Sequence, residues 1–150
     1  MVTLLIGLPA SGKSTYAAEE KPDLILSSDK IREELYGDEA RQGNPAEVFS
    51  VLYERMKKAI DNGNGSENII IDATNINRKD RSKAIEIAKG GNHIVRAVVM
   101  DTPIAVCIRR NDARERKVPD FVFDRMLKKY EEPTLSEGFD IIERQEWSAK

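Results

Sequence analysis

The apolar positions of this chain gather into short runs that alternate with segments of helical periodicity. Four runs, VTLLI (2–6), DLILSS (23–28), NIIIDA (68–73) and IVRAVVMD (94–101), are rich in β-branched residues, and we expect each to be a strand. Three of them lack polar alternation, which is typical of parallel strands covered on both faces. FDIIE (139–143) predicts a last short strand.

Helical patterns lie between these runs. Asn44-Pro45-Ala46-Glu47 combines an N-cap, a proline at the first helical position and an early acid, and it predicts a helix to about Asn62. Further helices are expected to begin near Lys13, Asn77, Thr102 and Pro119. Alternating strands and helices predict one α/β domain over residues 1–150, with a doubly wound, mainly parallel sheet and helices on both faces.

The segment GLPASGKST (7–15) follows the first strand directly and matches the phosphate-binding pattern G-x-x-x-x-G-K-[ST]. Glycines at positions 7 and 12 permit a close approach of the backbone to an anion. We expect Lys13 to reach the β- and γ-phosphates of ATP and Ser14 to bind Mg²⁺. A plain turn is the alternative, but the full motif in this place favours nucleotide binding. The residues expected to bind the nucleotide here are Gly7, Ala10, Ser11, Gly12, Lys13, Ser14 and Thr15.

Two acids follow predicted strands. Asp29 comes after LILSS and Asp72 ends NIII, so both should face the loop, because ligands of parallel sheets bind outside the carboxyl ends of the strands. A kinase needs one carboxylate at the acceptor hydroxyl, and magnesium commonly needs another. From spacing alone, Asp29 could equally be a helix N-cap and Asp72 a turn residue.

A run of basic residues, RRNDARERK (109–117), lies late in the chain. We expect a helix that ends before Pro119 and carries Arg110 and Arg114 on one face. A solvated helix face is the usual fate of a charge run. Beside a phosphate loop, however, such a segment can close as a lid over about residues 103–118, with its arginines neutralising the transferred phosphoryl group.

Composition narrows the possible functions. The formal net charge is −2, which argues against a broad nucleic-acid footprint, so any nucleic-acid contact should be local. One cysteine and one histidine give neither a disulfide nor a zinc cluster. No leader and no apolar run near 18 residues is visible, so we expect a cytoplasmic protein without a membrane span.

Taken together, these motifs resemble the kinase domain of polynucleotide 5′-kinases, within the small P-loop kinases, over nearly the full chain. GLPASGKST is similar to that family's phosphate loop, SSDKIR to its acceptor motif, IIDATNIN to its strand end and RRNDAR to its lid. YEEPTLSEGFDII resembles the tail of the animal enzymes' kinase domain. The D-x-x-R spacing resembles the phage form, whereas D-A-T-N resembles the animal form.

The resemblance implies transfer of the γ-phosphoryl group of ATP to a 5′-hydroxyl end of DNA or RNA. Asp29 would be the general base, Arg32 would hold the acceptor's phosphate, and Asp72 with Thr74 would shape the acceptor side. Arg114, beside Arg110, would clamp the donor phosphates, and Ser14 with Asp72 would hold magnesium. We expect no phosphatase or ligase domain within these residues, so a separate protein could supply those steps of end healing.

Two other functions stay open at this point. A kinase of a sugar, nucleoside or nucleotide-sugar would share the loop, the acids and the lid, and the acidic balance favours it slightly. A nucleotide-dependent switch ranks last, because neither a D-x-x-G nor an N-K-x-D segment is found. Residues 36–47 are either an acceptor-binding loop or a connection, and Trp147 either stacks on a base or packs in the tail.

Overall fold

A computed structural model describes residues 1–37, 44–114 and 118–147 of the chain. Its five strands form one sheet in the order β2-β3-β1-β4-β5, and every pairing is parallel. The strands are β1 (Val2–Ile6), β2 (Leu24–Ser27), β3 (Ile69–Asp72), β4 (Val95–Asp101) and β5 (Ile141–Glu146). The predicted doubly wound, parallel α/β fold is confirmed, and the last strand begins two residues later than FDIIE suggested.

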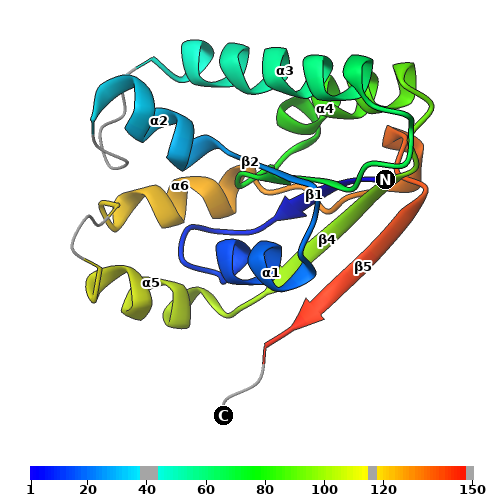
Figure 1. The fold of residues 1–150 in the computed structure, drawn as a ribbon. Coiled ribbons are helices and arrows are strands. Elements are labelled where there is room, and N and C mark those ends of the chain that lie inside the picture. Colours follow the sequence, from blue (N-terminus) through cyan, green and yellow to red (C-terminus); the bar gives the residue numbers. More distant parts are fainter. Residues whose placement is uncertain (38–43, 115–117, 148–150) are drawn as a thin grey trace.

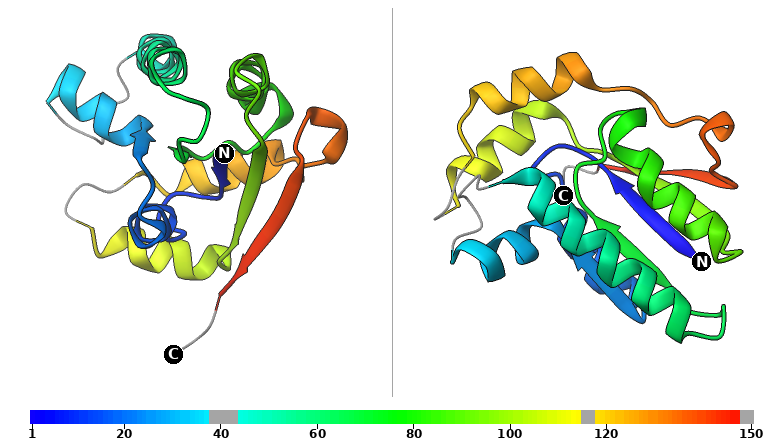
Figure 2. Two further views of the ribbon diagram at one scale, coloured as in Figure 1. Left: turned by 45° about the vertical axis from the view of Figure 1, so that its right-hand side comes forward. Right: turned by 90° about the horizontal axis from the view of Figure 1, so that it is seen from above.

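Six α-helices and one 3₁₀ turn are found in the described residues. They are α1 (Lys13–Glu20), α2 (Ser28–Tyr36), α3 (Pro45–Asn62), α4 (Arg78–Gly90), α5 (Ile104–Asp112), α6 (Phe121–Lys129) and η1 (Leu135–Glu137). Figure 1 and the left view of Figure 2 show α3 and α4 on one side of the sheet and α1 on the other. In the same described residues, no helix combines the length and apolarity that a membrane crossing requires.

The sheet is buried on both faces at its centre, which explains the unbroken apolar runs. On one face, Leu4 and Ile71 pack with Leu52 of α3 and Ala84 of α4 in the larger core. On the other face, a smaller core joins Leu5, Ala17, Ile70 and Val98 beneath α1. Strand β1 therefore supplies side chains to both cores, and its carboxyl end is held rigidly where the phosphate loop begins.

Side-chain caps account for where α3 and α4 begin. The side-chain oxygens of Asn44 and Asn77 accept hydrogen bonds from the backbone amides of Ala46 (3.0 Å) and Asp80 (2.9 Å), so both predicted N-caps are confirmed.

The start of α2 and the end of α5 differ from the sequence predictions. Ser27 caps α2 by accepting from the Lys30 amide at 3.2 Å, so the N-cap interpretation of Asp29 is wrong. Helix α5 ends at Asp112, earlier than RRNDARERK suggested. The buried Asn111 side chain ends it, because it donates to the Val118 carbonyl (2.6 Å) and accepts from the Val118 amide (3.0 Å).

Parts of two predicted segments lie outside the described residues, namely 38–43 of the loop 36–47 and 115–117 of the predicted lid. The ends of the first segment meet at Tyr36, whose hydroxyl accepts from the Asn44 amide (3.1 Å) and donates to Glu47 (3.0 Å).

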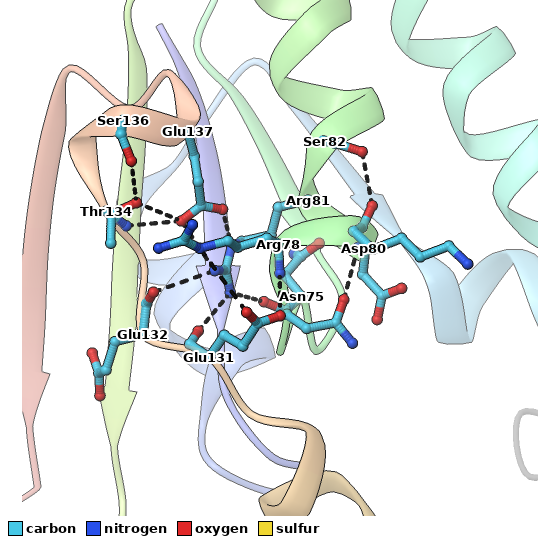
Figure 3. A network of polar contacts seen from close by, with 12 residues as sticks. Asn75, Arg78, Asp80, Arg81, Ser82, Glu131, Glu132, Thr134, Ser136 and Glu137 are labelled. Carbon is cyan, nitrogen blue, oxygen red and sulfur yellow. Dashed lines mark hydrogen bonds and ion pairs between the residues drawn. The ribbon is translucent and has the colours of Figure 1, made fainter.

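A buried guanidinium ties the carboxyl edge of the sheet together (Figure 3). The Arg81 side chain is 0% exposed and pairs with the Glu137 carboxylate, which its Nε contacts at 2.8 Å and its Nη2 at 3.1 Å. Its Nη1 donates to the carbonyls of Asn75 (2.9 Å) and Glu131 (3.0 Å). Arg81 therefore joins the loop after β3 to the segment that links α6 to β5.

Removing one member of this pair should destabilise the fold strongly. Glu137→Ala leaves the Arg81 charge buried without its carboxylate, so we expect the free energy of unfolding in urea to fall by about 3–5 kcal/mol. Glu143→Ala is the control, because Glu143 meets Arg96 at 3.5 Å with its side chain 50% exposed. The control should cost less than about 1 kcal/mol. Equal losses in the two variants would contradict a structural role for the Arg81 pair.

Candidate active site

The two loop glycines are required for different reasons. A Cβ at Gly7 would lie 2.6 Å from Ser11 Oγ, so a side chain there would collide with the loop itself. Gly12 has φ +100°, a conformation that side chains disfavour, and it stands at the N-cap of α1. The Gly7 amide also donates to the Thr74 carbonyl at 3.0 Å, which joins the loop to the end of β3.

The loop carbonyls are held from the side of β4 and α5. Thr102 Oγ1 donates to the Ser11 carbonyl at 2.8 Å, and Arg110 Nη1 donates to the Ala10 carbonyl at 3.4 Å. Because a trans peptide points its carbonyl and its amide in opposite directions, the Thr102 contact turns the Gly12 amide to the other side of the loop. These contacts shape the loop before any anion binds.

Lys13 and Asp72 are buried groups of opposite charge. Lys13 Nζ donates to the carbonyls of Gly7 (3.1 Å) and Leu8 (2.8 Å). Burial lowers the pKa of Lys13, and the charge of Asp72 opposes that shift. Burial likewise raises the pKa of Asp72, against the effects of Lys13 and of the Ser14 hydroxyl, which donates to Asp72 Oδ2 at 2.8 Å.

The pair of Ser14 and Asp72 fits a magnesium ion that arrives with a phosphate. It offers one hydroxyl and one carboxylate, and Mg²⁺ commonly completes its shell with water and phosphate oxygens. In the described part of the chain, no group of three or more His, Cys, Asp or Glu side chains could form an all-protein metal cage. The oxygen ligands therefore suit a nucleotide-bound ion.

The acceptor residues predicted on α2 form an ion pair. Arg32 Nη1 donates to Asp29 Oδ1 at 2.7 Å. The Asp29 side chain is 56% exposed, whereas that of Arg32 is 16% exposed and its Nε is buried without a partner among the described residues. A cation with an unused donor thus stands beside an accessible carboxylate.

One cleft of about 1360 Å³ joins these groups. Sites for a single small ligand usually occupy about 300–1,000 Å³, so the cleft has room for a donor and an acceptor. The predicted site residues that line it are Ala10, Ser11, Gly12, Lys13, Ser14, Thr15, Asp29, Arg32, Asp72, Thr74, Arg110 and Arg114. Gly7 is the exception, because it is part of the loop but does not line the cleft. Arg114 reaches the cleft from beyond the end of α5 rather than from the predicted helix face.

The sequence predictions missed the contribution of α6 to this cleft. Phe121, Arg125 and Lys129 line it, as do Phe49 of α3 and Lys79 of α4. The signal was present, because the three α6 residues recur at i, i+4 and i+8, but the prediction of that helix used only its apolar positions. Trp147 also lines the cleft, at the far end of β5.

A family model described as an AAA domain, AAA_33, matches residues 2–133, which is most of the chain. The chain belongs to the AAA_33 family. The match covers the phosphate loop, Asp29, Asp72 and the arginines at positions 110 and 114.

Several relatives of this AAA_33 domain are named as kinases, and two of them match nearly the whole chain. The L-seryl-tRNA(Sec) kinase of Methanococcus maripaludis is 28% identical over 94% of the chain, and the bifunctional polynucleotide phosphatase/kinase of Schizosaccharomyces pombe is 22% identical over 95%. The chain spans 56% of the length of the first protein and 32% of the second.

Solved structures share the fold. Kti12 of Chaetomium thermophilum, in complex with ADP-AlF3, superposes with a TM-score of 0.76 at 18% identity and covers 100% of this chain and 91% of that chain. A gluconokinase from Sinorhizobium meliloti gives 0.61 at 20% identity and covers 95% and 80%. The family and the kinase relatives support a nucleotide-binding P-loop kinase domain, and the names of these proteins differ in the acceptor.

Asp72→Asn should separate metal binding from stability. The raised pKa of Asp72 means that its charged form is less favourable in the folded chain than in the unfolded one, so losing the charge should leave the free energy of unfolding unchanged or higher. The magnesium concentration for half-maximal phosphoryl transfer should rise by roughly 10–100-fold. Urea unfolding and a magnesium titration measure the two effects. A large loss of stability with an unchanged magnesium requirement would contradict the assignment.

Proposed function

We propose that this domain transfers the γ-phosphoryl group of ATP to the 5′-hydroxyl end of DNA or RNA. The observation that carries the proposal is the Asp29–Arg32 pair, which lines the same cleft as Lys13 and the loop. A carboxylate is needed to accept the hydroxyl proton. A nucleotide at a 5′ end carries its first phosphate on the 3′ side, and the cation beside Asp29 suits that phosphate.

The donor side follows from the loop. Lys13 and the loop amides bind the β- and γ-phosphates, and Arg110 and Arg114 neutralise charge that develops on the transferred group. Magnesium, held through Ser14 and Asp72, would supply charge neutralisation between the donor phosphates. Asp29 orients the acceptor hydroxyl and takes its proton.

One fact supports a nucleic-acid acceptor over a small one, because the two kinase relatives described above carry a tRNA or a polynucleotide in their names. The fold by itself is neutral, because the gluconokinase shares it. The phosphatase named in the S. pombe relative points to a partner activity that another segment or protein would supply here.

The direct test is transfer of labelled γ-phosphate from ATP, with magnesium, to a short 5′-hydroxyl oligonucleotide. A seryl-tRNA, a nucleoside and a set of sugars are assayed in parallel. We expect label on the oligonucleotide, in DNA or RNA form. Label on a sugar or nucleoside alone would replace this proposal with the small-molecule kinase, and label on seryl-tRNA alone would move the hydroxyl from the 5′ end to an aminoacyl group.

Asp29→Asn tests the proposed base. It should lower turnover by about a hundredfold or more, because a general base contributes roughly 10²–10⁴-fold, while ATP affinity changes by only a few-fold. Asp61→Asn is the matched control, since Asp61 is exposed on α3 and lies outside the cleft. A parallel loss of ATP affinity in Asp29→Asn, measured by equilibrium titration, would argue against a role confined to the acceptor.

A further inference from the structure

One face of α6 extends the acceptor side of the cleft. We propose that Phe121, Arg125 and Lys129 bind the acceptor strand beyond its terminal nucleotide, with the two cations on successive phosphates. This inference rests on the proposed function, because only a polynucleotide acceptor has such a strand. The acceptor would then contact two regions of the protein. Asp29 and Arg32 on α2 would bind its reacting end, and the row on α6 would bind the strand beyond it.

The three side chains share one helix face and one cavity. Their spacing of four residues places them in a row, with Arg125 and Lys129 about 6 Å apart along the helix axis. All three line the cleft that also contains Asp29, and all three belong to exposed residues. A strand that leaves Asp29 along the cleft therefore meets the row.

Within the part of the chain that the structure describes, the cations of this row have no carboxylate partner. Among the described residues, no ion pair involves Arg125, Lys129 or the facing Lys79, whereas Arg144 on β5 pairs with both Asp101 and Glu132. The Arg125 guanidinium instead stacks on the Phe121 ring, 4.9 Å from its centre. Unpaired cations on a chain of net charge −2 are suited to a polyanion, and an exposed ring beside them is suited to an unpaired base.

Helix α6 is held firmly at both ends, so the row keeps its place. Before the helix, Val118 is bound by the Asn111 side chain, and after it the Glu131 amide donates to the Ile76 carbonyl at 2.7 Å. Between these points, Phe123 and Met126 pack with Leu8 and Cys107 against the start of the phosphate loop. The right view of Figure 2 shows α5 and α6 running beside each other.

The contact at Ile76 also sets the direction of the row. It brings the Lys129 end of α6 next to the loop after β3, and Lys79 lines the cleft from the start of α4. The Phe121 end follows Val118, which the Asn111 side chain of α5 binds. A bound strand would thus cross between α6 and the start of α4, with cations on either side.

Acceptor length is the variable that tests the row. The wild-type protein and Arg125→Gln/Lys129→Gln are assayed for phosphorylation of a nucleoside 3′-monophosphate and a 5′-hydroxyl hexanucleotide, at several salt concentrations. The wild type should have a much lower KM for the hexanucleotide than for the mononucleotide. The double variant should reduce that ratio by about tenfold or more. It should also flatten the dependence of log KM on log salt by about 0.7 for each acceptor phosphate that the variant no longer binds.

Lys128→Gln is the matched control, because Lys128 is exposed on the same helix but does not line the cleft. It removes one cation and should keep the wild-type length preference and salt slope. Melting temperatures of all variants check folding. If the hexanucleotide is phosphorylated and the double variant matches Lys128→Gln, the row on α6 is overturned and the proposed function stands. If the wild type phosphorylates neither acceptor, the proposed function fails and the inference fails with it.

Discussion

The carboxyl edge of the sheet, where the cleft lies, depends on the ion pair and hydrogen bonds of the buried Arg81 guanidinium. Taking a charged group out of water costs several kcal/mol, and here the cost is offset by a carboxylate and by backbone carbonyls together. Its bond to the Asn75 carbonyl matters most, because the Asn75 side chain donates to the Leu5 carbonyl at 2.8 Å and the preceding Thr74 carbonyl accepts from Gly7. One side chain thereby connects α4, the end of β3, the start of the phosphate loop and the segment after α6.

The buried charges of the cleft lower the stability of the folded chain, whereas the Arg81 network raises it. Burial disfavours the charged forms of both Lys13 and Asp72, and each charge only partly relieves the other. The phosphate and magnesium of the proposed function would complete the electrostatic balance of this site. Because the surrounding core holds these residues in place, the domain tolerates groups that would otherwise move toward water, which is a common trade between stability and function.

Local sequence patterns accounted for much of the fold. Strands, the N-caps at Asn44 and Asn77 and the phosphate loop depend on neighbours a few residues away, so they could be predicted directly. The end of α5 could not, because it is set by the contact of Asn111 with Val118, seven residues along the chain. Nor could the role of Arg81, whose carboxylate partner lies 56 residues along the chain. The acids at positions 29 and 72 were found because parallel topology gathers strand ends at one edge, whereas α6 joins that edge only through tertiary packing.

The net charge of the whole sequence does not describe the charge of the cleft. Taken over the whole sequence, an acidic total favours a small acceptor, but a ligand responds to the local field and not to the sum. Outside the cleft, some carboxylates are paired with cations, as in the pairs of Glu34 with Arg55 and of Asp101 with Arg144. Within it, Arg125 and Lys129 have no such partner among the described residues. Seven Lys and Arg residues line the cleft against five Asp and Glu residues, so the cleft is cationic although the whole chain is acidic, and the net charge of the chain gives no argument against a polyanionic acceptor.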